Sequence, residues 1–276
     1  KFYRPGRWSL EAIQEEHQFL FDLRDAEIPV CSPLRFPDGS SVKEVEGIYY
    51  ALWPRTGGRA PEELNDGQIE ILGRLLARIH NVGDSVRASA RRVLTGESIG
   101  LSALDLLEDN GFLPPSCADR FADAVEEVAE IYDDRSEGVP YLRIHGDCHM
   151  GNLLQGLQGW YFLDFDDFLT GPAVHDVWML LPGQDFESKR QRSVLIDAYR
   201  QFRSFEHSWF NLVEPLRALR FIFYAGWIAK RWEDPAFPKA FPHFGSDRYW
   251  EDETRDLELQ LERIRSDEGE FATLGP

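Results

Sequence analysis

The stretch "LRIHGDCHMGNLLQGLQGWYFLDFDD", residues 142–167, places two His, four Asp and one Asn within 26 residues. Apolar runs flank these polar residues, and we expect strands at 141–144, 153–155 and 160–165. The turn "LQGLQG" would join the last two strands into a hairpin. Loops at strand ends are where a rigid scaffold presents polar groups into a cleft. The stretch therefore predicts a functional site built on a hairpin and the loop before it.

Three side chains of this stretch have the chemistry of a metal-assisted site. Asp147 and Asn152 are five residues apart, and Asp164 returns from the far side of the hairpin. Two oxygen donors on opposite sides of a hairpin can chelate one small hard cation, and Asn and Asp oxygens suit Mg²⁺. We therefore expect Asn152 and Asp164 to bind Mg²⁺. That leaves Asp147 to accept a hydrogen bond from an attacking hydroxyl group.

The neighbouring polar side chains are open to more than one interpretation. We expect His145 to be a structural residue that hydrogen-bonds backbone. His149 either packs within the loop or contacts substrate or phosphate. Asp166 either adds a metal or substrate contact or belongs to a solvated acidic loop. These residues are therefore expected to support the site rather than to carry its chemistry.

A different class of function would use the alternating residues of the same loop. His145, Asp147 and His149 fall on one side of an extended segment and could clasp a transition metal in a hydrolase. This alternative leaves Asn152 and Asp164 without a role.

The whole chain restricts the class of protein. It has 276 residues, 43% of them hydrophobic, and a net charge of -18, which argues against a duplex-DNA binder. No apolar run approaches about 20 residues, so we expect no membrane span. The three cysteines (Cys31, Cys117 and Cys148) form no CxxC pair, which favours a reducing compartment. We expect a monomer.

Periodic apolar residues place helices and strands along the chain. Helices are expected at 9–25, 65–83, 116–133, 173–181, 187–202, 209–232 and 250–264, and further strands at 41–44 and 48–53. The segment "PRTGGRAP" resembles a linker in composition. The sequence thus predicts an α+β chain with a small β-rich N-terminal lobe, residues 1–55, and a larger, mostly helical lobe, residues 56–276.

The polar stretch also resembles a known superfamily. "HGDCHMGN" followed by "LDFDD" resembles the catalytic loop and metal-binding segment of protein-kinase-like enzymes. Gly146 stands where eukaryotic kinases have Arg, and the short segment after Asp164 resembles the aminoglycoside phosphotransferase and choline kinase branch. Within it, "IQEEHQFL", "IHGDCHMGNLL" and "GPAVHDVWMLL" closely resemble the bacterial stress response kinase A family. The resemblance implies a bilobal fold, ATP and Mg²⁺ as cofactors, and a cytoplasmic serine/threonine protein kinase with Asp147 as base.

The resemblance also implies how the phosphates of ATP are held. Lys1 would contact the α- and β-phosphates, and Glu16 on the first helix would hold Lys1 by an ion pair. Glu15 points about 100° away around the helix and is the second candidate. No Gly-rich phosphate loop precedes Lys1. We therefore expect residues upstream of Lys1 to be missing from this sequence.

Two further features of the family have counterparts here. The backbone near Leu52 and Trp53 would read the adenine base. Asp176 would bind the backbone amides of the catalytic loop and hold Asp147 in place.

The acceptor is left open between a protein Ser/Thr hydroxyl and a small hydroxyl compound, such as an amino sugar or amino alcohol. If the protein itself lacks a Gly-rich phosphate loop, the chain would be a catalytically silent binding domain.

Overall fold

The structure, a computed structural model, describes residues 1–157 and 159–266, in which helices predominate over short strands. Packing groups residues 1–93 with 140–206 into a first unit, and residues 94–139 with those from 207 onward into a second. The predicted α+β class is confirmed. This grouping does not test the predicted lobe boundary near residue 55, which stays a prediction, and the last ten residues of the predicted helical lobe lie outside the described residues.

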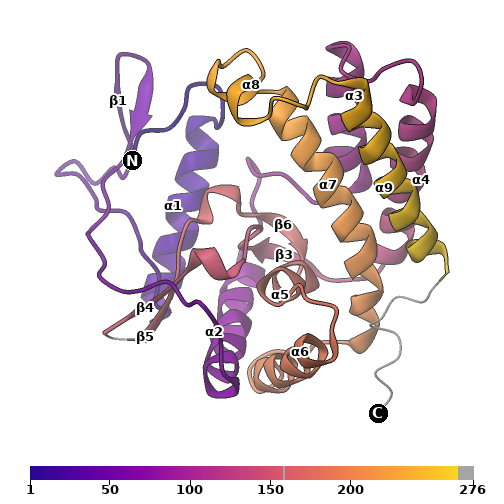
Figure 1. Cartoon of the computed structure of the whole chain (residues 1–276). Coiled ribbons are helices and arrows are strands. Elements are labelled where there is room, and N and C mark those ends of the chain that lie inside the picture. Colours follow the sequence, from indigo (N-terminus) through magenta and orange to yellow (C-terminus); the bar gives the residue numbers. More distant parts are fainter. Residues whose placement is uncertain (158, 267–276) are drawn as a thin grey trace. The chain divides into compact units, whose positions relative to one another are not determined.

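The first unit holds the described strands, and these form three antiparallel pairs: β1 with β2, β3 with β6, and β4 with β5. Figure 1 shows β4 beside β5 and β3 beside β6. In chain order its elements are α1 (Leu10–Asp25), β1 (Lys43–Val45), β2 (Ile48–Tyr50), α2 (Asp66–Ser85), β3 (Tyr141–Ile144), β4 (Leu153–Gly156), β5 (Gly159–Phe162), β6 (Leu169–Pro172), α5 (Val174–Leu180) and α6 (Phe186–Tyr199).

Local sequence signals fix the start of α1 and the edge beside it. Ser9 caps the helix, because its side chain accepts a hydrogen bond from the amide of Ala12 at 3.2 Å. The first residues of the chain run along β2, with the Tyr3 amide donating to the carbonyl of Tyr49 at 2.8 Å. Lys1 lies at the end of this ladder, where its carbonyl accepts from the amide of residue 51 at 3.0 Å.

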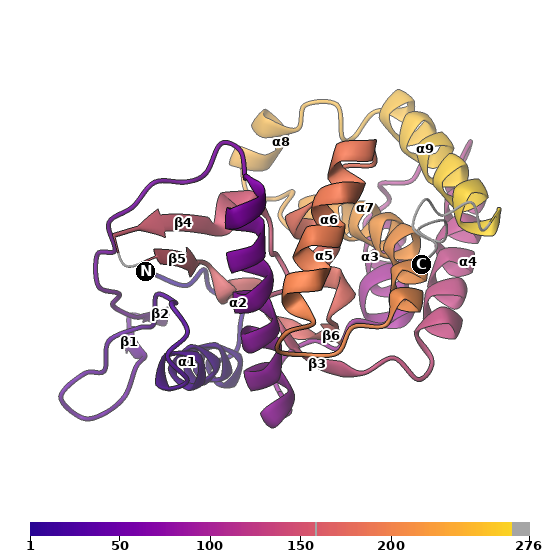
Figure 2. The same ribbon diagram turned by 90° about the horizontal axis from the view of Figure 1, so that it is seen from below.

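Helix α2 is the packing centre of the first unit. Asn65 and Gln68 form a reciprocal capping box at its start. Its apolar stripe is fully buried, and the helix packs against α6 and β3 (Figure 2). The stripe consists of Ile69, Leu72, Leu76 and Ile79. Burial of these side chains explains why a periodicity of 3.6 residues predicts this helix correctly.

The hairpin of β4 and β5 carries two predicted site residues at its open end. The amide of Leu163 donates to the carbonyl of Asn152 at 2.9 Å, which continues the ladder one step beyond the strands. The predicted strand at 160–165 is therefore too long: β5 ends at Phe162, because the chain turns at Asp164.

The second unit is helical in its described residues. Helices α4, α7 and α9 pack against one another, and α3 packs on α7 (Figure 1). None of the helices within 1–157 and 159–266 combines the length and apolarity that a membrane crossing needs. The elements of this unit are a π-helical turn (Gly96–Leu101), α3 (Ser102–Asp109), α4 (Ala118–Ser136), a 3₁₀ turn (His207–Leu212), α7 (Val213–Ala229), α8 (Ala236–Ala240) and α9 (Asp247–Arg265).

Candidate active site

The Lys1 ammonium group lies among three carboxylates of the first unit. Its Nζ is 3.9 Å from Glu16 Oε1 and 3.6 Å from Asp164 Oδ1, and it contacts Asp166 directly. It also lies 5.4 Å from the ring centre of Trp53. The fold thus brings together the start of the chain, helix α1 and the turn after β5. In this arrangement Asp166 is the closest ion-pair partner of Lys1, and Glu16 and Asp164 are more distant.

Glu16 is the buried acid of α1, and Glu15 is engaged elsewhere. The Glu16 side chain is 2% exposed. Burial raises the pKa of Glu16, although the charges of Lys1 and Arg91 oppose that shift. The carboxylate of Glu15 instead accepts hydrogen bonds from the amide and hydroxyl of Ser89, both at 2.8 Å. Of the two candidates, Glu16 is therefore the one that faces Lys1.

Asp147 lies in the loop after β3 and contacts two predicted site residues. The Nδ2 of Asn152 donates to the Asp147 carbonyl at 2.9 Å and lies 3.4 Å from Asp147 Oδ2. The ring Nε2 of His149 is 3.4 Å from the same Oδ2. The Asp147 side chain remains 28% exposed. Because Asn152 uses its amide nitrogen within the loop, its oxygen is the atom that can serve as a cation ligand.

Asp164 adopts a backbone conformation that is unusual for a residue other than glycine. Its φ is 59° and its ψ is 67°, in the left-handed region. Such strain is found disproportionately at functional sites, where the surrounding fold holds it in place. The turn presents the carboxylate outward, with its side chain 59% exposed. The hydrogen bond between Leu163 and Asn152 sets this turn at the same end of the hairpin as Asn152.

Asp176, at the start of α5, is fully buried beneath the loop that carries Asp147. Its Oδ2 accepts from the amide of His145 at 2.7 Å, and its Oδ1 accepts from the amide of Gly146 at 2.9 Å. His80 Nε2 lies 3.1 Å from Oδ2. Burial alone would raise the pKa of Asp176, but hydrogen bonding and charge from His80, with the nearby His145 and His175, lower it below its usual value. The carboxylate therefore binds the loop as an anion.

The His145 ring is used by the backbone around it. Its Nε2 lies 2.8 Å from the carbonyl of Leu163, and its Nδ1 lies 3.3 Å from the amide of Asp147. The ring packs against Phe165 with a centroid distance of 4.4 Å. These contacts connect the loop of Asp147 to the turn of Asp164, so His145 supports the structure of the site.

Leu52 and Trp53 follow residue 51, whose backbone hydrogen-bonds with that of Lys1. The carbonyl of Leu52 accepts from the amide of Leu34 at 2.7 Å. The indole nitrogen of Trp53 donates to the carbonyl of Cys31 at 3.1 Å. Both residues thus form part of an ordered segment beside the Lys1 ammonium group.

Gly146, next to Asp147 in the loop after β3, occupies a position that a residue with a Cβ would not fit. Its φ is +80°, and a Cβ at this position would lie 2.3 Å from the carbonyl oxygen of Asp167. We expect Gly146→Ala to lower the free energy of unfolding by more than about 2 kcal/mol, since left-handed strain alone contributes roughly 1–2 kcal/mol. Urea unfolding of purified protein measures this loss.

Gly39→Ala is the matched control for that measurement. Gly39 has a φ of +85°, but a Cβ added there would have no neighbouring atom within 4 Å. This variant therefore reports backbone strain without a clash. Equal losses in the two variants would contradict the proposed close approach of Asp167 to Gly146.

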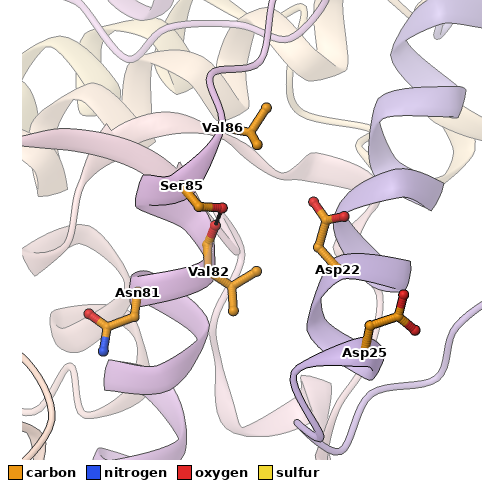
Figure 3. Close-up of a pocket in the computed structure, with 6 residues that line it drawn as sticks. All are labelled: Asp22, Asp25, Asn81, Val82, Ser85 and Val86. Atoms are coloured by element: carbon orange, nitrogen blue, oxygen red, sulfur yellow. Dashed lines mark hydrogen bonds between the residues drawn. The ribbon is translucent and has the colours of Figure 1, made fainter.

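A separate hollow lies beside the other end of α1. Figure 3 shows Asp22 and Asp25 of α1 across from the C-terminal end of α2. The hollow has a volume of about 510 Å³. It is lined by Asp22, Asp25, Asn81, Val82, Ser85 and Val86, none of which is a predicted site residue.

Several charged residues at the site were not predicted from the sequence. The Nη2 of Arg7 donates to both carboxylate oxygens of Asp167 at 3.0 Å. Arg91 contacts Glu16, and His80 contacts Asp176. Arg91 belongs to the polar run "VRASARRV", whose only signal is a local excess of basic residues. Such an excess ordinarily indicates a solvated surface, so the contacts of these residues could be identified only from the structure.

Known proteins share this arrangement of sequence and fold. The model of the phosphotransferase enzyme family matches residues 1–212. This chain belongs to the phosphotransferase enzyme family. Stress response kinase A of Escherichia coli strain K12 is 40% identical over 251 residues, which cover 91% of this chain and 76% of that protein. The serine/threonine protein kinase RdoA of Salmonella typhimurium strain LT2 is 38% identical over 255 residues, covering 92% of this chain and 77% of its own.

The fold of this phosphotransferase also matches solved kinases. The structure of the amicoumacin kinase hAmiN superposes with a TM-score of 0.71 over 97% of this chain and 81% of that protein, at 18% identity. The predicted resemblance to stress response kinase A and the predicted protein-kinase-like fold are therefore confirmed. Because these relatives are kinases, the assignment as a kinase is preferred over the two other hypotheses, a metal-dependent hydrolase and a silent binding domain.

Proposed function

We propose that this phosphotransferase transfers the γ-phosphate of ATP, with Mg²⁺, to a Ser or Thr hydroxyl of a protein. The observation that carries the proposal is the meeting of Lys1, Glu16 and Asp164, in the same unit as Asp147 and Asn152. Phosphoryl transfer depends mostly on positioning and electrostatic stabilisation, which such a set of charges can supply. The name of one relative, a serine/threonine protein kinase, supports a protein acceptor.

The nucleotide side of the site would rest on Lys1 and Glu16. The Lys1 ammonium group would bind the α- and β-phosphates, and Glu16 would hold it in place from α1. Trp53, whose ring lies 5.4 Å from Nζ, would border the adenine together with the backbone of Leu52. ATP binding would draw Lys1 away from Asp166, its closest partner here.

The metal side would rest on the open end of the β4–β5 hairpin. Asn152 and Asp164 offer hard oxygen donors: the amide nitrogen of Asn152 is turned toward Asp147, and the Asp164 carboxylate is 59% exposed. This donor set fits Mg²⁺, which would neutralise charge on the β- and γ-phosphates when bound. Asp166 would add a contact from the same turn. The amicoumacin kinase with the similar fold was solved with AMP-PNP and Ca²⁺.

Asp147 would orient the acceptor hydroxyl and take its proton. Asn152 and His149 hold its carboxylate from two sides, and the anion of Asp176 fixes the loop beneath. His149 would be available to the acceptor or the phosphate, because its side chain is 43% exposed. We further propose that the kinase is a cytoplasmic monomer.

A second acceptor class, a small hydroxyl compound, is favoured by one feature of the fold. The turn at Phe165–Asp167 is followed by β6 and then directly by α5 at Val174, which leaves no long activation segment to bind a peptide. Solved proteins of similar fold include a spectinomycin phosphotransferase and an aminopropanol kinase.

Parallel assays with labelled ATP and Mg²⁺ test the proposal. One arm offers bacterial protein extract as acceptor, and the other offers a panel of aminoglycosides, amino alcohols and choline. We expect label on protein Ser or Thr, with none on the panel. Label on a small compound alone would replace the protein acceptor by the second class, and no transfer in either arm would contradict the proposal.

A further inference from the structure

Arg91 is a buried cation that joins two parts of the candidate site. Its Nε donates to the carbonyl of Ala12 at 2.9 Å, and its Nη1 donates to the carbonyl of Asp166 at 2.5 Å. Its Nη2 lies 3.4 Å from Oε2 of Glu16. One guanidinium group thus holds the backbone of α1, the acid of α1 and the turn that carries Asp164.

The surroundings of Arg91 restrict it to this position. The residue is 5% exposed, and its guanidinium carbon lies 4.3 Å from the ring centre of Trp8 and 4.4 Å from that of Phe168. A planar group with donors in a fixed fork can satisfy three acceptors while it packs against aromatic rings, whereas a lysine ammonium is a compact point charge without that fork. The site is therefore built for arginine.

Glu16 divides its carboxylate between two cations. Oε1 faces Lys1 at 3.9 Å, and Oε2 faces Arg91 at 3.4 Å. Arg91 therefore fixes the orientation of the acid that is proposed to hold Lys1. The same guanidinium sets the spacing between α1 and the turn of Asp164, because it bridges carbonyls on both.

We propose that Arg91 is a positioning residue that couples Glu16 and Lys1 to the metal-binding turn at Asp164. This inference rests on the proposed function, because it assigns Arg91 to the nucleotide and metal side of that site. The loop of Asp147 is held by Asp176 instead. Loss of Arg91 should therefore weaken Mg²⁺–nucleotide binding and turnover, while binding of the acceptor is retained.

Arg143 provides a matched control within the same unit. It is 4% exposed, its Nη1 donates to the Asp22 carboxylate of α1 at 3.0 Å, and its guanidinium carbon lies 4.4 Å from the ring centre of Phe19. Arg91→Met and Arg143→Met each remove a buried arginine that clamps α1. Of the two arginines, only Arg91 lies between Glu16 and the turn of Asp164. If Arg91 had a merely structural role, the two variants should affect ligand binding equally.

The test measures Mg·ADP affinity by calorimetry, thermal stability, and kcat and KM for each substrate. We expect Arg91→Met to weaken Mg·ADP binding and to lower kcat on the order of 10²-fold, as misplacement by about 1 Å can do, with the acceptor KM unchanged. Arg143→Met should lower stability alone. Arg91→Lys should recover part of the affinity, and it serves as the readout if Arg91→Met does not fold.

The binding measurements can overturn the coupling role in more than one way. Equal Mg·ADP affinity in wild type and in the Arg91 variants would refute it while leaving the proposed function intact. Additive losses in Arg91→Met and Glu16→Gln would show that Arg91 does not act through Glu16. Wild-type protein that binds no Mg·ADP would instead refute the proposed function, and the coupling role with it.

Discussion

Asp147→Ala is expected to lower kcat by roughly 10²–10⁴-fold, the range typical for removal of a general base. Asp147 lies with His149 and Asn152 in the loop after β3, whereas Lys1 contacts Glu16, Asp164 and Asp166. The variant should therefore bind Mg·ADP as the wild type does. Single-turnover kinetics with Mg·ATP, alongside calorimetry with Mg·ADP, separate the two effects.

Asp147→Asn sharpens this expectation. Asparagine keeps the size of the side chain and one oxygen for Asn152, but it cannot take a proton from the acceptor. If Asp147 acts as the base, Asn and Ala should lose similar fractions of turnover. Asp25→Asn removes an equal charge from an exposed position of α1 and should leave turnover unchanged. Wild-type turnover in Asp147→Asn would show that the group only orients the acceptor.

The elements predicted correctly are those whose signals are local. Ser9 caps α1 and marks its start, and Asn65 with Gln68 caps α2 and marks its start. Each cap lies within the first turn of its helix. The turn between β1 and β2 follows from Glu46 and Gly47, whose φ values are 50° and 78°. Capping and turn chemistry involve neighbours in sequence, so a single sequence is sufficient to predict them.

Two features of the strands that were not predicted depend on the fold around them. Strand β6 contains Gly171 and Pro172, which argue against a strand, and it forms because it pairs with β3. Strand β5 ends early because Asp164 turns the chain in a left-handed conformation. In both places the tertiary structure outweighs the local preference of the residues.

The candidate site shows the same division. Asp147 and Asn152 are five residues apart, and the hairpin brings Asp164 back, so their proximity could be predicted from spacing. Arg91 reaches Glu16 across 75 residues of sequence, and nothing in its own segment indicates a partner. The close contact of Lys1 with Asp166 rather than Glu16 also depends on how the turn packs against α1.

Asp176→Ala is the second change with a large expected effect, and it acts on stability as well as activity. The substitution leaves the amides of His145 and Gly146 buried without their acceptor, and removes the partner of His80 Nε2. Leaving a buried hydrogen-bond donor without its acceptor costs about 1–3 kcal/mol, so we expect the two amides together to lower the free energy of unfolding by roughly 2–6 kcal/mol. Turnover of the folded protein should also fall, because the loop of Asp147 loses its anchor.

The pH dependence of that loss tests whether Asp176 binds the loop as an anion. Its pKa is lowered in the folded protein relative to its usual 3.8, so its stabilisation is present above that value and is lost as pH falls through the folded pKa. The stability difference between wild type and Asp176→Ala should stay constant from about pH 8 to about pH 5 and should narrow only in stronger acid.

Glu214→Ala is the control for the effect of Asp176→Ala on turnover, because this acid of the second unit is 6% exposed and pairs with Gln260 at 2.6 Å. It should lower stability without slowing the turnover of folded protein. If Asp176→Ala behaved in the same way, the carboxylate would stabilise the fold without positioning Asp147.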